Sequence, residues 1–318
     1  MPKNPPAPIA LFVYNRIDHT RKTIEALQKN FLATESELFI FCDNAKNYDS
    51  NQAVQAVRDY VKSVQGFKNV TIIEREKNLG LAQSIISGVS EIVEKFGHII
   101  VLEDDMVTSP HFLEYMNEAL ELYETEEKVI SIHGYIYPVK KTLPETFFLR
   151  GADCWGWATW KRGWDIFEKD GSKLLQELQQ KKLTKIFDFD GCYPYIRMLE
   201  DQISGKNNSW AIRWYAAAFL ANKLTLYPGK SLVQNIGFDG SGTHCADMSA
   251  FDIEISPEKL LLEKIPLVEN TQAREAIKKF FKPKKSFIKK IIHRINKKRK
   301  KRQLIKSHKL NIEAQFLN

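Results

Sequence analysis

The sequence predicts an α/β protein in which helices flank a mostly parallel sheet. Up to residue 133, short apolar runs alternate with longer segments whose apolar residues recur at helical spacing. One apolar run, residues 99–102, has four aliphatic residues in succession, which is typical of a strand covered by helices on both faces. Because the crossovers between such strands are right-handed, we expect the strands to lie parallel in one sheet.

The expected elements follow one another regularly in this part of the chain. Strands are predicted at 9–13, 37–42, 70–73, 99–102 and 129–133. Apolar side chains at helical spacing indicate the helices between them. These are Ile24, Leu27 and Phe31 after a Thr20 cap; Val54, Val57, Val61 and Val64; Leu81, Ile85, Val89 and Ile92; and Phe112, Leu113, Met116 and Leu120 after Ser109 and Pro110.

The pattern becomes irregular after residue 133. Residues 174–189 are expected to be helical, and a strand is expected near 224–228. Between them, one packed face can form from Trp214, Ala217, Ala218 and Ala221. Four of the six tryptophans fall between Trp155 and Trp164, where interspersed glycines argue against a long helix. Aromatic rings at this density can form a wall for the apolar faces of sugar rings, and packing in the core is the alternative.

Composition places the chain among globular proteins. Its 318 residues are 43% hydrophobic, enough for one large domain or two small ones. The four cysteines, Cys42, Cys154, Cys192 and Cys245, form no CxxC pair, so neither a zinc site nor a disulfide framework is indicated. The apolar run after the N-terminal prolines is too short for a signal peptide, and no later run has membrane-spanning length. We therefore expect a cytoplasmic protein.

The net charge of +8 is divided unevenly along the chain. Residues 278–318 hold 16 basic and one acidic side chain, and residues 1–277 hold 31 basic and 38 acidic ones. An acidic body argues against a nucleic-acid-binding core. In the tail, one helical face would be apolar and the other basic, which is typical of a helix lying on an anionic membrane. A solvated tail or an RNA-binding arm is the alternative.

Three adjacent carboxylates, Glu103, Asp104 and Asp105, follow the apolar run 99–102. Ligands of open α/β sheets bind at the carboxyl ends of the strands. Like charges this close are unfavourable without a cation, and carboxylate oxygens suit Mg²⁺ or Mn²⁺ bound with a diphosphate. A solvated acidic turn before the helix is the alternative.

A glycine-rich loop follows the strand at 224–228 and carries Asp239 and His244. Its backbone amides could bind phosphate, and the imidazole could bind a metal. A single histidine is more often structural or merely exposed, so both interpretations stay open.

Five segments together resemble nucleotide-sugar glycosyltransferases of the GT-A fold. They are VYNR, REKNLGLAQSIISG, VLEDDM, WGWATWKRGWD and SLVQNIGFDGSGTH, within about residues 7–250. The chain resembles a bacterial group of sugar transferases related to the Golgi N-acetylglucosaminyltransferase that initiates complex N-glycans. The resemblance implies a GT-A domain at 1–277, with a nucleotide-binding part near 7–135 and an acceptor-binding part near 136–255, followed by a basic tail at 278–318.

The resemblance also implies roles for individual residues. Asp105, with His244, would hold Mn²⁺ or Mg²⁺. Nucleotide contacts would come from Asn15, Arg16, Asp43, Asn78, Gly80, Glu103 and Asp104, and substrate contacts from Trp155, Gly156, Trp157, Asp239 and Gly240.

The implied reaction moves a hexosyl or N-acetylhexosaminyl group from a nucleoside-diphosphate sugar, with a UDP-sugar favoured, to a hydroxyl. The acceptor would be a saccharide or lipid-linked saccharide in bacterial surface polysaccharide or glycolipid synthesis, and the outcome inverting. The resemblance places an Asp base where this chain has Asn208, whose amide cannot accept the proton. Either Asp201 is the base instead, or the enzyme is slow, or the expected alignment is shifted. A sugar nucleotidyltransferase and a non-catalytic nucleotide-sugar-binding protein are the alternatives.

Overall fold

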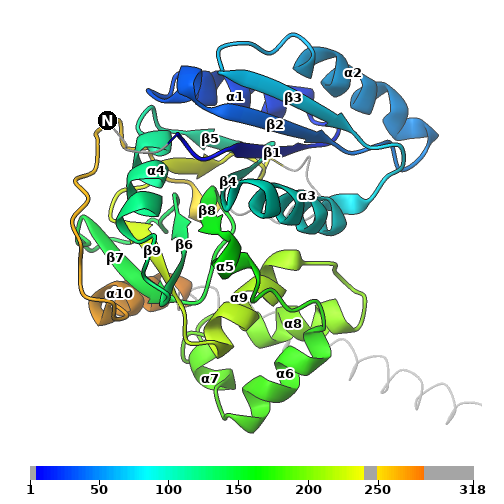
Figure 1. The fold of residues 1–318 in the computed structure, drawn as a ribbon. Coiled ribbons are helices and arrows are strands. Elements are labelled where there is room, and N and C mark those ends of the chain that lie inside the picture. The colour runs from blue at the N-terminus through cyan, green and yellow to red at the C-terminus, as the bar shows by residue number, and fades with distance from the viewer. Residues whose placement is uncertain (1–4, 240–248, 283–318) are drawn as a thin grey trace, which may run out of the picture. The chain divides into compact units, whose positions relative to one another are not determined.

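An eight-stranded sheet forms the centre of the computed structural model, which describes residues 5–239 and 249–282 (Figure 1). The strand order is β3-β2-β1-β4-β8-β6-β9-β7. Strands β1 to β4 are parallel to one another, as are β6 and β9, whereas β7 and β8 run antiparallel to their neighbours. The strands are β1 (Ile9–Val13), β2 (Glu37–Cys42), β3 (Asn69–Glu74), β4 (His98–Glu103), β6 (Val129–His133), β7 (Thr146–Arg150), β8 (Trp157–Trp160) and β9 (Leu224–Pro228). The expected mostly parallel sheet is thus confirmed.

Two further strands form a small separate sheet beside the main one. In it, β5 (Met106–Thr108) pairs antiparallel with β10 (Val233–Asn235). Because β5 begins directly after Asp105, this pairing brings the segment after β10 to the carboxyl end of β4.

Helices cover both faces of the parallel strands. Figure 1 shows α1 and α2 on one side of β1–β3 and α3 on the other. The helices are α1 (Ile17–Gln28), α2 (Asn51–Val61), α3 (Gly80–Phe96), α4 (Phe112–Leu122), α5 (Lys161–Trp164), α6 (Gly171–Gln180), α7 (Thr184–Phe187), α8 (Tyr195–Ile203), α9 (Trp210–Leu220) and α10 (Thr271–Phe281), with 3-10 turns η1 (Ala33–Glu35), η2 (Tyr48–Ser50) and η3 (Ser249–Phe251).

The core under α3 depends on close helix–sheet contact. The rings of Phe12 and Phe41 stack at a centroid distance of 4.9 Å, and Gly88 of α3 lies directly over them. A Cβ at Gly88 would stand 2.7 Å from the Phe12 ring, so only glycine lets the helix approach this closely. The four aliphatic residues at 99–102 are all buried, as expected of a strand covered on both faces.

Some local predictions differ from the structure at places where tertiary contacts determine the conformation. Helix α1 begins at Ile17, so Thr20 is not its cap; the Thr20 hydroxyl instead donates to the Arg16 carbonyl inside the helix. The helix expected after Ser109 begins only at Phe112, because residues 106–108 form β5. The tryptophan-rich segment, expected to be irregular, contains strand β8, whose side chains are buried throughout.

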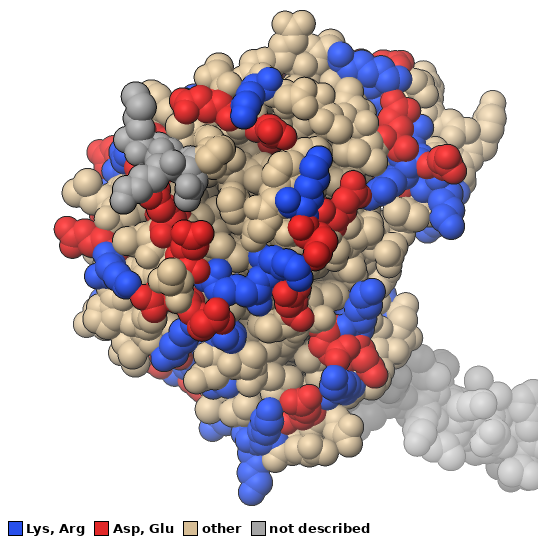
Figure 2. All heavy atoms as spheres, in the orientation of Figure 1, with Lys and Arg blue, Asp and Glu red and all other residues tan. Residues whose placement is uncertain are grey.

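Charged side chains of both signs are interspersed on the face shown in Figure 2. Many form exposed ion pairs, such as Lys259 with Glu118 at 2.6 Å. Pairs of this exposure contribute little to stability, so the core carries most of it. Within the described parts of the chain, no helix is both long and apolar enough to cross a membrane.

The compact unit of the protein extends to Phe280. The division predicted between residues 277 and 278 falls inside α10, where Lys278 contacts Asp190 at 2.9 Å. That division stays a prediction. The expected amphipathic face from Phe287 to Ile295 lies outside the described residues.

Candidate active site

Strand β4 places the three carboxylates beside the end of β1. Glu103 is the last residue of β4 and pairs in register with Phe12 of β1. The chain leaving β1 therefore passes the acidic residues, and the Arg16 Nη2 group donates to Asp104 Oδ1 and, at 2.6 Å, to Asp105 Oδ2. Asn15 and Arg16 thus lie at the carboxyl edge of the parallel strands, and their nucleotide contacts stay predictions.

Electrostatics at this site are strongly perturbed. Burial alone would lower the pKa of Arg16, but the charges of Asp104 and Asp105 outweigh it and raise that pKa. Burial, then the charges of Asp105 and Asp104, raise the pKa of Glu103 to about 8. Burial is also the main reason that the pKa of Asp104 rises to about 6. Repulsion of this kind is what a bound cation would relieve.

One oxygen of Asp105 fits a metal ligand. Among the described residues, Asp105 Oδ1 is buried and accepts no hydrogen bond, although a buried carboxylate oxygen normally has a partner. The described residues contain no group of three or more His, Cys, Asp or Glu that could hold a metal alone. Mg²⁺ and Mn²⁺ often bind through one or two carboxylates with substrate phosphates, so a single open carboxylate suits them.

The loop after β10 packs directly against this carboxylate. The Ile236 amide donates to the Asp105 carbonyl at 2.9 Å. A Cβ at Gly237 would lie 2.2 Å from Asp105 Oδ2, so glycine is required there. Sequence reasoning missed Gly237, although its position in the glycine-rich loop was the available signal. Further along, Asp239 Oδ2 lies 3.2 Å from His19 Nε2. Gly240 and His244 lie outside the described residues.

Asp43 accepts hydrogen bonds from two other predicted nucleotide-binding residues, Asn78 and Gly80. Its Oδ1 accepts from the amides of Asn44 and Leu79, and its Oδ2 from Asn78 Nδ2 and the Gly80 amide, at 2.9–3.2 Å. An ionised carboxylate has about four acceptor positions, so these bonds fill Asp43. Asp43 therefore fixes the loop that begins α3. The nucleotide contacts of Asp43, Asn78 and Gly80 stay predictions.

The structure contradicts the expected role of Trp157. This ring is 1% exposed and packs against Trp164, Trp210 and Trp214 at centroid distances of 5.4–6.0 Å. The reason is that β8 lies between β4 and β6, inside the sheet, with its side chains buried. Gly156 is buried as well, with its φ of +66° and with Val233 and Leu102 against it. Trp157 thus belongs to the core and presents no face to a sugar.

Trp155 keeps its candidate role. It precedes β8 and is only half-buried. Its ring lies 4.7 Å from that of Tyr135 and 5.5 Å from that of Phe238, which neighbours Asp239. Trp155 therefore contacts both the aromatic ring of Tyr135 and the glycine-rich loop after β10, which carries Phe238 and Asp239.

Asp201, the expected base, lies on α8. Asn208, which stands where the resemblance places an Asp base, follows that helix. Asp201 accepts from Arg197 Nε at 3.3 Å and from Lys206 Nζ at 3.2 Å. Asn208 is exposed in the loop before α9. Their catalytic roles stay predictions.

Sequence reasoning missed a second polar cluster, in which tyrosine and histidine side chains surround the single carboxylate of Asp153. Asp153 Oδ2 accepts from the hydroxyls of Tyr137 at 3.0 Å and Tyr227 at 3.3 Å. His133 Nε2 lies 3.8 Å from Asp153 Oδ1. An acidic residue directly before the tryptophan-rich segment was the available signal.

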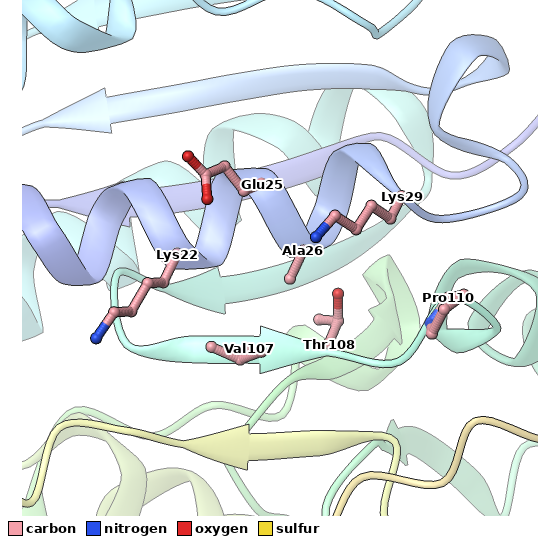
Figure 3. A pocket seen from close by; sticks show the side chains of 7 residues that line it. All are labelled: Lys22, Glu25, Ala26, Lys29, Val107, Thr108 and Pro110. Carbon is pink, nitrogen blue, oxygen red and sulfur yellow. The ribbon is translucent and has the colours of Figure 1, made fainter.

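A surface hollow of about 350 Å³ lies between α1 and β5 (Figure 3). None of the predicted site residues lines it. The lining residues are Lys22, Glu25, Ala26, Lys29, Val107, Thr108 and Pro110. The hollow is therefore separate from the carboxylate site.

The fold and this site define an α/β protein with a cation-compatible carboxylate cluster at the carboxyl end of its parallel strands. The model of Glycosyl transferase family 2 matches residues 9–197, more than half of the chain, and the protein belongs to that family. No curated protein matches the sequence.

Several solved structures resemble the fold at low identity. The mannosyltransferase PcManGT from Pyrobaculum calidifontis, in complex with GDP-Man and Mn²⁺, is 13% identical over 43% of this chain and 39% of its own, with a TM-score of 0.31. TarS of S. aureus is 13% identical over 48% and 47%, with a TM-score of 0.31. A UDP-glucose pyrophosphorylase complexed with UDP-glucose is 12% identical over 70% and 90%, with a TM-score of 0.35. The matched regions span less than half of the first two structures, and scores this low say nothing about activity.

Proposed function

We propose that the protein transfers a hexosyl or N-acetylhexosaminyl group from a nucleoside-diphosphate sugar to an acceptor hydroxyl, with Mn²⁺ or Mg²⁺ held at Asp105. The observation that carries this proposal is the buried Asp105 Oδ1 without a hydrogen-bond partner among the described residues. It lies next to Arg16, at the edge of the sheet where ligands of α/β proteins bind.

The residues divide the work of binding. Asp105 would hold the cation, and the cation would stabilise the charge that develops on the leaving diphosphate. Arg16, which contacts both Asp104 and Asp105, would then have its guanidinium close to the diphosphate. Asp43 holds the α3 loop in place through Asn78 and Gly80, and this loop would contact the nucleotide. We propose an inverting outcome and a UDP-sugar donor, following the resemblance.

A donor screen tests this function. The purified protein is mixed with UDP-, GDP- and CMP-sugars, with and without Mn²⁺, and both donor hydrolysis and thermal stabilisation are measured. We expect one nucleotide class to raise the unfolding temperature and to be hydrolysed slowly, only when Mn²⁺ is present. Release of pyrophosphate from UTP and a sugar phosphate would indicate a nucleotidyltransferase instead. Stabilisation without turnover, even with saccharide acceptors, would indicate a binding protein.

We also propose that the acceptor belongs to bacterial surface polysaccharide or glycolipid synthesis, and that the basic tail brings the cytoplasmic enzyme to the inner face of the membrane. The tail's +15 charge supports binding to anionic lipids. Because Lys278 is tied to Asp190, a truncation should leave α10 intact and remove residues 283–318. The truncated protein should no longer float with anionic liposomes. Unchanged flotation would contradict the membrane role.

A further inference from the structure

We propose that Asp153 is the general base that accepts the proton of the acceptor hydroxyl. This inference rests on the proposed function and names a residue for its chemical step. Four observations carry it: strand register, shared neighbours, the hydrogen bonds of the carboxylate and its exposure.

Strand register brings Asp153 beside the acidic triplet. Strands β4 and β8 are antiparallel, with Val101 opposite Trp157. The residues just before β8 therefore run along the carboxyl end of β4. A Cβ at Gly156 would lie 3.4 Å from the Leu102 side chain, so the two segments stay adjacent beyond the last paired residues. Residues 153–155 thus approach the metal-binding edge of the sheet.

Shared neighbours support this placement. Cys154 is partly buried, and besides burial the charges of Asp153, Glu103 and Asp105 together raise the pKa of its thiol. Asp153 and the triplet are therefore both close to Cys154. Trp155, two residues from Asp153, contacts Phe238 of the glycine-rich loop after β10. Gly237 of the same loop packs against Asp105. Asp153 and the carboxylate cluster thus border the same region of the protein.

Hydrogen bonds hold the carboxylate in one orientation. Oδ2 accepts from the Tyr137 and Tyr227 hydroxyls, and Oδ1 accepts from the Cys154 amide at 2.8 Å. A carboxylate oxygen has two lone pairs, so within the described residues Oδ1 keeps one for a further donor. The Asp153 side chain is 21% exposed, enough for contact with a ligand.

The titratable neighbours of Asp153 are uncharged at pH 7. Burial lowers the pKa of His133, and burial raises the pKa of Tyr137 and Tyr227, so the imidazole is uncharged and both hydroxyls keep their protons. His133 Nε2 accepts from the Trp155 amide at 3.1 Å, which fixes that nitrogen as an acceptor. The other titratable side chains around Asp153 are Tyr135, Cys154, Tyr193, Tyr195 and Tyr215.

The step balances as a single displacement. The acceptor oxygen attacks C1 of the sugar and forms the new C1–O bond. The bond from C1 to the diphosphate oxygen breaks, and its electron pair leaves with the nucleoside diphosphate. The proton of the attacking hydroxyl passes to Asp153 Oδ1. Asp201 differs, because the cationic side chains of Arg197 and Lys206 both contact its carboxylate.

Hydrolysis of the active donor, with Mn²⁺ and with water in place of the acceptor, tests the assignment. We expect Asp153→Asn to lower turnover at least about 100-fold. Thermal stabilisation by donor and Mn²⁺ should stay at the wild-type level. Asp165→Asn, which changes an exposed carboxylate paired with Lys161, should hydrolyse donor as the wild type does.

Two further variants separate a base from a structural role. Tyr137→Phe and Tyr227→Phe each remove one hydrogen bond and leave the carboxylate, so each should cost less than about 10-fold. Losses as large as that of Asp153→Asn would show that the network only supports the fold and would overturn the assignment. So would wild-type turnover in Asp153→Asn, or a loss found only in Asp201→Asn. Failure of the wild type to bind or hydrolyse any donor would instead refute the proposed function.

Discussion

Two carboxylates, Asp105 and Asp153, occupy the same edge of the sheet but are held in different ways. Asp105 contacts the cationic Arg16 and keeps one buried oxygen without a partner among the described residues. Asp153 is bound by neutral tyrosine hydroxyls and a backbone amide and is partly exposed. The first arrangement suits a divalent cation, and the second suits proton transfer. A cationic neighbour in the first case and neutral neighbours in the second would thus suit one residue type to two chemical roles.

Removing the metal-binding carboxylate should have the largest effect. Asp105→Ala deletes the open oxygen, and we expect donor hydrolysis to fall by about 100- to 1,000-fold or more, the range for removal of a key electrostatic group. The stabilisation by Mn²⁺ in a thermal unfolding assay should disappear. The matched control is Asp59→Asn, which changes an exposed carboxylate on α2. A Mn²⁺ response that survives in Asp105→Ala would contradict the metal site.

Substitutions of Trp155 and Trp157 should distinguish a residue that binds the acceptor from one that packs in the core. Trp157→Ala leaves a large cavity in the core and should cost about 3–5 kcal/mol of unfolding free energy. Trp155→Ala removes a half-buried ring and should cost less than half of that, while weakening acceptor binding. Urea unfolding measures the first effect and the KM for acceptor the second. Equal losses of stability would show that Trp155 is also a core residue.

A larger side chain at Gly237 should displace the Asp105 carboxylate while leaving that residue in the chain. A methyl group in Gly237→Ala would overlap Asp105 Oδ2, so the carboxylate or the loop must move. We expect the Kd for Mn²⁺, measured by titration calorimetry, to rise about 10-fold, which corresponds to about 1.4 kcal/mol at the lower end of overpacking costs. An unchanged Kd would show that the loop yields freely.

A third carboxylate, Asp190, shows what ion pairing does away from the site. Hydrogen bonds from Arg274 and Lys278 lower its pKa to about 2. A folded-state pKa below the unfolded value means that this stabilisation is present above about pH 4 and is lost as pH falls toward 2. Asp190→Asn should therefore lower the unfolding temperature by about 1–3 °C at pH 7, and by less at pH 3. The same difference at both pH values would contradict the ion-pair origin.

The sequence was most informative where local pattern and burial coincide. Five strands, among them 9–13 and 129–133, were predicted from short, mostly apolar runs, and both of these strands are buried along their whole length. The acidic triplet was predictable for the same reason, since its three residues follow such a run directly. The GT-A resemblance agrees with the observed mostly parallel sheet, and the family match shows that the chain belongs to Glycosyl transferase family 2. The Golgi relation stays a resemblance.

The rest depends on contacts that no short stretch of sequence contains. Trp157 was misplaced because four nearby tryptophans predict an aromatic surface equally well as a core. The Asp153 cluster joins side chains from three distant segments, Tyr137, Asp153 and Tyr227, which only the pairing of β6, β8 and β9 brings together. Gly237 is required only because β10 pairs with β5.

That short β5–β10 ladder also sets the order in which the enzyme can mature. The ladder links the segment right after Asp105 to one near residue 235, so closing it waits for a long stretch of intervening chain. A ribosome-bound chain that has emerged only through α9 can pair β1 with β4 but lacks the glycine that abuts the carboxylate. Catalytic competence should therefore arrive late in synthesis, well after the parallel strands have assembled.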